Sequence, residues 1–150
     1  MIRHLNDYLT EKKFTNFCAR AGDASKLSLE NNSMDSIMSF NAIHHFDLDK
    51  FFSESHEILK DDGKLIIYTR LRNQNYRSIW GEYFPLFGDM ENRLYELNEL
   101  KEYAKNADMS IKSTRVFGHA RTSTLERLVQ QAKGNHYSTF ALYDEETFDE

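Results

Sequence analysis

Two short apolar segments with an amphipathic segment between them constrain the fold most strongly. The runs MDSIMSF at 34–40 and LIIY at 65–68 have the length and composition of strands buried on both faces, although periodicity alone does not separate the first from a helix. From Leu48 to Leu59 the apolar residues recur at helical spacing, and Asp47 or Asp49 can cap the start. The pattern predicts a β-α-β unit with a strand at 35–40, a helix at 48–60 and a strand at 64–69.

The same alternation of helix and strand continues on both sides of this unit. Helical spacing of apolar residues and short β-prone runs predict five further elements: helix 2–9, strand 14–19, helix 98–107, strand 110–117 and helix 124–133, the last with a capping box at Ser123–Glu126. Strict alternation implies an α/β fold, with an open, mostly parallel sheet and flanking helices.

The chain is expected to form a single domain with one insert. It has 150 residues and shows no internal repeat or flexible linker. Residues at about 70–95 interrupt the alternation with a dense set of aromatic side chains, among them Trp80, Tyr83 and Phe84. We interpret this insert as a cover whose aromatics are mainly core, with an apolar or cationic substrate site as the alternative.

The strand predictions also specify which side chains are buried. Five residues of the two central strands are expected in the core: Ile37, Phe40, Leu65, Ile66 and Ile67. The polar residues 30–32 are expected to be exposed. On this basis Ile66→Ala should destabilise the protein by about 2–5 kcal/mol.

Composition excludes several classes of protein. The net charge is −5 and the 19 basic residues are scattered, which argues against nucleic-acid binding. No apolar run is long enough to cross a membrane and no signal-peptide cleavage site is evident, so we expect a soluble cytoplasmic protein without a membrane partner. The single cysteine, Cys18, rules out an internal disulfide and a multi-cysteine zinc site. Its apolar surroundings indicate a buried, inert thiol, and we expect no metal.

The residues that follow the predicted strands are the candidates for a ligand site, because open α/β sheets bind ligands beyond the carboxyl ends of their strands. Here these are the turn at 22–24 (Gly-Asp-Ala), the loop at 41–46 (Asn-Ala-Ile-His-His-Phe) and the pair Thr69-Arg70. The Asp23 carboxylate can accept a hydrogen bond from an exocyclic amine such as that of adenine. Taken alone, however, Gly22-Asp23 is more often a simple turn.

The order of these turns, strands, loops and helices along the chain is more specific to one protein family than any single segment is. The stretch GDASKLSLENNSMDSIMSFNAIHHFDLDKFFSESHEILKDDGKLIIY resembles the class I S-adenosylmethionine-dependent methyltransferases of the methyltransferase type 11 kind, and the likeness extends at decreasing specificity over 1–117. It implies a Rossmann-like fold and methyl transfer from S-adenosylmethionine to a small-molecule substrate.

The resemblance also implies the roles of individual residues. Asp23 and the amide of Ala24 would face the adenine, Asn41 and Ala42 would border the methionine part, and His45 would close the cofactor pocket. The alternatives for His45 are a structural role or a catalytic base. No catalytic residue is assigned, since methyl transfer depends mainly on alignment of the reacting atoms.

The chain departs from that family at its start. No Gly-x-Gly-x-Gly turn is present, and Met1 matches a position inside such proteins. We therefore expect an N-terminally truncated, partial methyltransferase domain that lacks the first two strands of the family fold. In the sheet, those strands would lie between the predicted strands at 14–19 and 34–40. Alone it should bind the cofactor weakly or not at all, be inactive, and expose strand edges through which it could form a homo-oligomer.

Two other readings remain open. The chain could be a non-catalytic methyltransferase-like remnant that acts as an interaction or partner subunit. It could also be an unrelated doubly wound domain, which would need a phosphate loop or a clustered acidic site, and the sequence shows neither. Affinity for S-adenosylmethionine distinguishes the partner-subunit hypothesis from the enzyme hypothesis.

Overall fold

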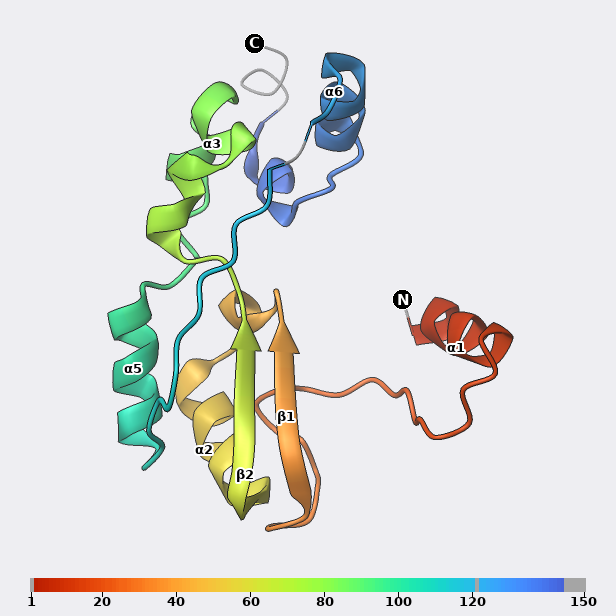
Figure 1. Cartoon of the computed structure of the whole chain (residues 1–150), viewed down its shortest axis with the longest axis vertical. Coiled ribbons are helices and arrows are strands. Elements are labelled where there is room, and N and C mark those ends of the chain that lie inside the picture. The colour runs from red at the N-terminus through yellow and green to blue at the C-terminus, as the bar shows by residue number, and fades with distance from the viewer. Residues whose placement is uncertain (1, 121, 145–150) are drawn as a thin grey trace.

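The centre of the protein is the predicted β-α-β unit. The computed structural model describes residues 2–120 and 122–144, so Met1 lies outside the described residues. Strands β1 (Met34–Phe40) and β2 (Leu59–Tyr68) run parallel and are connected through helix α2 (Leu48–Ile58), as Figure 1 shows. Their register aligns Ser36 with Lys64 and Phe40 with Tyr68, with an irregularity between Met34 and Ser36. The predicted strand, helix and strand are confirmed.

Three other predicted helices are also confirmed. They are α1 (Ile2–Glu11), α5 (Leu97–Asn106) and α6 (Leu125–Lys133). The N-cap of α6 is Thr124 and not Ser123 as the capping box suggested, because the Thr124 hydroxyl accepts the N–H of Arg127 at 3.3 Å. Capping by the residue one position later starts the helix at Leu125.

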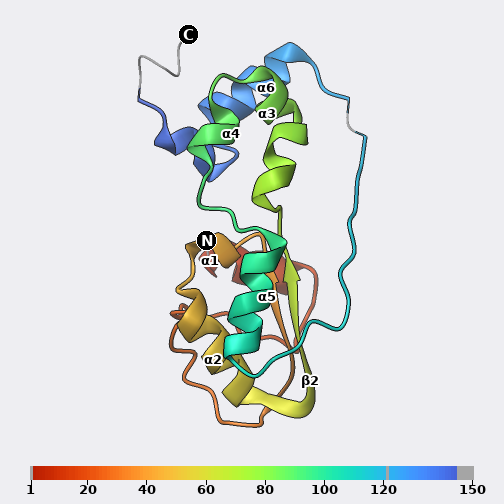
Figure 2. The same cartoon turned by 90° about the vertical axis from the view of Figure 1, so that its left-hand side faces the viewer.

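The main hydrophobic core lies on one face of the sheet. Helices α2 and α5 pack there, side by side (Figures 1 and 2). The buried residues of this core are Ile43, Leu48, Phe51, Phe52, Leu100 and Ala104, and Ile37, Leu65 and Ile67 contact it from the strands. The apolar stripes of the two helices face each other and the sheet, which is why both helices form as the sequence predicts.

A second, smaller core builds a cap beyond the carboxyl ends of the strands. The insert forms a 3-10 helix η2 (Arg72–Arg77) and helices α3 (Ile79–Tyr83) and α4 (Phe87–Met90), which pack with α6 and the 3-10 helix η3 (Ser138–Leu142) (Figure 2). Trp80, Phe87, Ala132 and Phe140 are its buried residues. The interpretation of the insert as core is confirmed for Trp80, whereas Tyr83 is 74% exposed.

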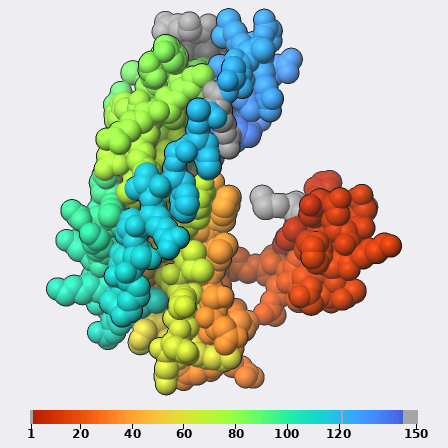
Figure 3. Space-filling view, in the orientation of Figure 1, coloured from red at the N-terminus to blue at the C-terminus, as the bar shows by residue number. Residues whose placement is uncertain are grey.

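The predicted strands at 14–19 and 110–117 are wrong. Both segments are irregular and make no ladder with the two-stranded sheet. Figure 3 shows the second segment running over the surface of the molecule. A strand needs a neighbour to satisfy its backbone N–H and C=O groups, and no partner strand lies beside either segment in residues 2–120 and 122–144.

Part of the predicted core is also wrong, because helices cover only one face of the sheet. Phe40 is 63% exposed and Ile66 is 42% exposed; together with Met38 and Tyr68 they form an open apolar face. Phe40 and Tyr68 stack there with ring centroids 4.5 Å apart. The strands therefore alternate between a covered and an open side instead of being buried on both.

Of the remaining expectations about exposure, one is confirmed and one is wrong. Residues 30–32 are exposed, as predicted. Cys18 is exposed as well, contrary to expectation, because the apolar run around it does not enter either core. Among the residues that the structure describes, no helix has the length and apolar character needed to cross a membrane.

The one-sided core leads to a stability prediction. Ile43 is 1% exposed, so Ile43→Ala should lower the free energy of unfolding by about 2–5 kcal/mol. Ile66→Ala, on the open face, should lower it by at most about 1 kcal/mol, the span of β propensity. Urea denaturation of both variants tests this difference, and Ile43→Val serves as a milder probe if Ile43→Ala does not fold. Equal losses at the two positions would mean that the open face is covered in solution.

Candidate functional site

The loop after β1 begins with a backbone conformation that few residues tolerate. Asn41 has a φ of 48°, in the left-handed region where asparagine is enriched, and its N–H donates to the carbonyl of Tyr68 at 2.8 Å. The chain then turns into the 3-10 helix η1 (Ile43–His45), where the N–H of His45 donates to Ala42 at 2.9 Å. This turn places Asn41 and Ala42 directly at the carboxyl end of the sheet.

The Asp23–Ala24 turn packs beside the start of α2. The Asp23 carboxylate accepts the N–H of Ser25 at 2.8 Å, and Ala24 contacts the hydrophobic core that contains Ile43. Lys50, in the first turn of α2, has a pKa raised chiefly by Asp47 and to a smaller extent by the charge of Asp23. The structure therefore packs Ala24, of the 23–24 turn, and Ile43, of the 41–45 loop, in the same core.

The two adjacent histidines have different surroundings. His45 is exposed, whereas His44 is half-buried and its ring centroid lies 4.0 Å from that of His45. Within the described part of the chain, the buried Nδ1 of His44 has no hydrogen-bond partner. Burial, and next the nearby His45, lower the pKa of His44 below its usual value, and a weaker attraction from Glu91 opposes them. His44 is therefore neutral at pH 7.

A buried acidic residue links the cap to the C-terminal part of the chain. Glu91 is 4% exposed, accepts two hydrogen bonds from the Arg93 guanidinium at 3.0 and 2.8 Å, and accepts the hydroxyl of Thr139. Arg93 also donates to the hydroxyl of Ser138 at 3.3 Å. This cluster joins segments more than forty residues apart in the sequence.

Arg70, two residues after the end of β2, is tied into the same cap. The Arg70 guanidinium donates to the side-chain oxygen of Asn75 at 3.0 Å and lies 4.9 Å from the centre of the Tyr137 ring. Asn75 is fully buried and donates to the carbonyls of Phe87 and Gly88 at 3.4 Å. Sequence reasoning included His44 in the candidate loop at 41–46 and Arg70 among the residues that follow a strand, but it did not select Asn75, Glu91 or Arg93. These three residues follow no recognisable spacing.

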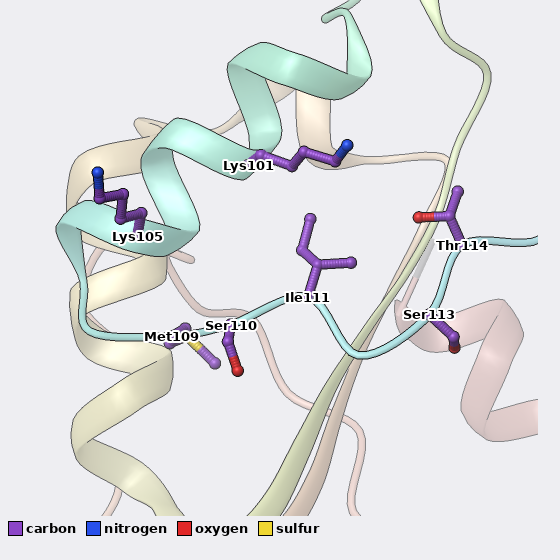
Figure 4. A pocket seen from close by; sticks show the side chains of 7 residues that line it. All are labelled: Lys101, Lys105, Met109, Ser110, Ile111, Ser113 and Thr114. Carbon is purple, nitrogen blue, oxygen red and sulfur yellow. The ribbon is translucent and has the colours of Figure 1, made fainter.

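Two hollows lie elsewhere on the molecule. One of about 440 Å³ is lined by α5 and the segment after it, with Lys101, Lys105 and Ile111 around its mouth (Figure 4). The other, of about 120 Å³, is apolar and lies between α3 and α6. Neither is lined by Asp23, Ala24, Asn41, Ala42 or His45. No cluster of three potential metal ligands occurs in residues 2–120 and 122–144.

Comparison with known proteins identifies the N-terminal half of the chain. Residues 1–67, which end within β2, match the methyltransferase domain family. Over these residues the chain is therefore similar to methyltransferase domains. Methyltransferase domains of this family generally use S-adenosylmethionine. The matched region contains the 23–24 turn, the 41–45 loop and almost the whole β-α-β unit.

A solved structure extends the likeness to the rest of the fold. The chain is similar, with a TM-score of 0.68 and 22% sequence identity, to the crystal structure of a protein from Anabaena variabilis described as a methyltransferase from an antibiotic biosynthesis pathway. The alignment covers 94% of this chain and 62% of that one, so this chain spans less than two thirds of the length of the similar structure. No curated protein matches this chain.

The Glu91 cluster of the cap predicts a pH dependence of stability. Burial alone would raise the pKa of Glu91, but the hydrogen bonds from Arg93 and Thr139 outweigh it and hold the pKa below the usual 4.5. A carboxylate with a depressed pKa stabilises the fold above its unfolded pKa, and this contribution is lost as pH falls through and below 4.5.

Glu91→Gln should remove that contribution. At pH 7 we expect it to lower the free energy of unfolding by about 1.5–3 kcal/mol, the usual range for hydrogen bonds to a charged group. Below pH 4.5 the difference from the wild type should shrink. Urea unfolding at a series of pH values measures both effects, with Glu102→Gln on the exposed side of α5 as the matched control. A constant difference across this range would contradict the assignment.

Proposed function

We propose that this chain is part of an enzyme that transfers the methyl group of S-adenosylmethionine to a small-molecule acceptor. The observation that carries the proposal is the convergence of the 23–24 turn and the 41–45 loop on one core at the start of α2. Both segments lie inside the region that matches the methyltransferase domain family. Ligands of open α/β sheets bind beside such segments.

The residues at this position have the chemistry to hold the cofactor. Asp23 is exposed and uses one carboxylate oxygen for the N–H of Ser25, and a carboxylate can accept further hydrogen bonds, here from the adenine amine. The Ala24 amide would lie next to the same ring. Asn41 and Ala42 would border the methionine part, and the exposed ring of His45 would form a wall of the site.

The methyl acceptor would bind under the cap. S-adenosylmethionine supplies an electrophilic methyl group, and alignment of the acceptor atom with that group provides most of the acceleration. His44 belongs to the β1 loop and is close enough to Glu91, Arg93 and Arg70 for their charges to act on its pKa, and within the described residues its Nδ1 has no hydrogen-bond partner. It can accept the proton that a hydroxyl or ammonium acceptor must release, which makes it a better candidate than the exposed His45.

The proposal includes truncation of the cofactor site. The sequence has no Gly-x-Gly-x-Gly turn, and the sheet formed by the described residues has two strands. The backbone amides that approach the carboxylate end of the cofactor would then come from sequence outside these 150 residues. The isolated chain is expected to keep the residues that would contact the adenine and to lack the backbone amides that would contact the carboxylate end of the cofactor.

A partner-subunit role is the second candidate function. The proposed cofactor residues line neither of the two hollows, which is what a methyltransferase-like domain without a cofactor would show. In that case the fold would serve association and no variant at Asp23 would affect function. Cofactor affinity separates the two functions directly.

Calorimetry with S-adenosylhomocysteine tests the proposal on the isolated chain. Several hydrogen bonds of about 0.5–1.5 kcal/mol each are missing from the site, so binding should be weaker than for a complete enzyme by orders of magnitude. Asp23→Ala should abolish the residual binding, and Asp62→Ala, an exposed acidic residue distant from the turn in sequence, should leave it unchanged. Low-micromolar binding by the isolated chain would contradict the truncation.

A longer protein that includes an upstream glycine-rich segment tests the roles of single residues. There Asp23→Ala should weaken cofactor binding about tenfold, the equivalent of one hydrogen bond near 1.4 kcal/mol. His44→Gln should lower kcat by about a hundredfold or more with little change in cofactor affinity, whereas His45→Gln should leave kcat nearly unchanged. If His45→Gln has the larger effect on kcat, the choice between the two histidines is wrong.

A further inference from the structure

Arg70 is a cationic side chain at the carboxyl end of the sheet. It follows β2 at the point where the chain enters the cap (Figure 1), and it is half-buried. None of the ion pairs within residues 2–120 and 122–144 includes its guanidinium. Removing part of a charge from water costs free energy unless an opposite charge compensates it. The guanidinium is therefore a candidate binding group for an anion that lies outside the described residues.

The contacts that hold the guanidinium fix its position without neutralising its charge. Its Nη1 donates to Oδ1 of Asn75 at 3.0 Å, and its central carbon lies 4.9 Å from the centre of the Tyr137 ring. Asn75 is itself fully buried and donates to the carbonyls of Phe87 and Gly88. An arginine carries five N–H donors in a planar fork, so the bond to Asn75 leaves most of them available. A carboxylate fits such a fork with two parallel hydrogen bonds.

The charges around this position favour an anion with a single negative charge. Three groups of fixed charge influence the pKa of His44: Glu91, Arg93 and Arg70. Glu91 and Arg93 neutralise each other through two hydrogen bonds at 3.0 and 2.8 Å. Of these three charges, that of Arg70 is the one left unbalanced. A carboxylate matches it better than a phosphate ester, which carries a charge of about −1.5 to −2 at pH 7.

We propose that Arg70 binds a carboxylate of the methyl acceptor, so that the acceptor is a small carboxylic acid. This inference rests on the proposed methyl transfer and names the class of its acceptor. His44 is close enough to Arg70 to be influenced by its charge, and its buried Nδ1 has no hydrogen-bond partner in the described residues. A carboxylate on Arg70 would hold the rest of a small acceptor beside His44. Arg70 is in this sense a residue that determines specificity.

A cationic acceptor fits this position less well. The aromatic side chains of the insert made a cationic substrate an alternative, because aromatic rings attract cations to their faces. In the structure, however, the guanidinium of Arg70 itself lies over the Tyr137 ring. Trp80 is buried and packs edge to face against Tyr137 and Phe140. A second positive charge beside Tyr137 would be repelled by Arg70, whereas a carboxylate would be attracted to it.

Titration of the 150-residue chain with benzoate, followed by NMR, tests the proposal. Benzamide is the control probe, because it has nearly the same shape and no charge. We expect benzoate to bind with a dissociation constant on the order of 1 mM, and benzamide about tenfold more weakly or less tightly still. The pKa of His44 should rise when benzoate is bound, because the anion offsets the charge of Arg70, which lowers that pKa.

Variants of Arg70 separate binding of the carboxylate from a structural role. Arg70→Gln keeps a hydrogen-bond donor but removes the charge, so it should weaken benzoate binding about tenfold or more and abolish the preference over benzamide. Arg70→Lys should retain part of the preference, since lysine keeps the charge and loses the planar fork. Arg127→Gln, at an exposed arginine of α6 in the same cap, is the matched control and should bind benzoate like the wild type.

Several outcomes would overturn the proposal. It fails if the wild type binds neither probe or binds both equally, and if Arg70→Gln keeps the preference for benzoate while circular dichroism shows a folded chain. Tighter binding of inorganic phosphate than of benzoate would also contradict it. If Arg70→Gln does not fold, the wild type decides, because an unchanged pKa of His44 at saturating benzoate rejects the site.

The outcome is independent of cofactor binding. Benzoate is titrated without S-adenosylhomocysteine, and Arg70, Asn75, Tyr137 and His44 all belong to the described residues. If benzoate binds through Arg70 but the longer protein does not bind S-adenosylhomocysteine, the anion site stands and the proposed methyl transfer fails. If the cofactor binds and benzoate does not, only the assignment of a carboxylic acid as acceptor fails.

Discussion

The rest of the structure depends on the parallel pairing of β1 with β2 under helix α2. Only these two strands satisfy each other's backbone groups in the described residues, and the covered side of their sheet holds the main core. The pairing also places the ends of both strands together, so that the loops starting at Asn41 and Thr69 leave from the same edge. Every candidate residue of the site is positioned by one of these loops or packs against this unit.

A second set of interactions joins the cap to that edge. Arg70, two residues after the end of β2, contacts Asn75 and Tyr137, and Glu91 accepts hydrogen bonds from both Arg93 and Thr139. These contacts link the insert to the segment after α6, which is distant in sequence. The fold thus has two regions that are stabilised differently: an apolar core between the sheet and helices α2 and α5, and a cap that contains charged, partly buried groups. His44 lies where the two meet.

The candidate site could be predicted only in part. The order of the 23–24 turn, the β-α-β unit and the Asn-Ala-Ile-His-His-Phe loop was enough to indicate the methyltransferase domain, which the match at 1–67 confirms. The assignment of Asp23, Ala24, Asn41, Ala42 and His45 to the cofactor stays a prediction. No local pattern distinguished His44 from His45, because the difference in their burial arises only when the chain folds.

The sequence by itself determined the helices and the central β-α-β unit, because amphipathic spacing and capping act within a few residues along the chain. Only the tertiary structure decided which β-prone runs become strands and which strand faces are buried. The segments at 14–19 and 110–117 have strand-like composition but no neighbour, and Phe40 and Ile66 are apolar but face no helix. A strand forms only when a distant segment supplies its hydrogen bonds, and a side chain is buried only when another layer covers it.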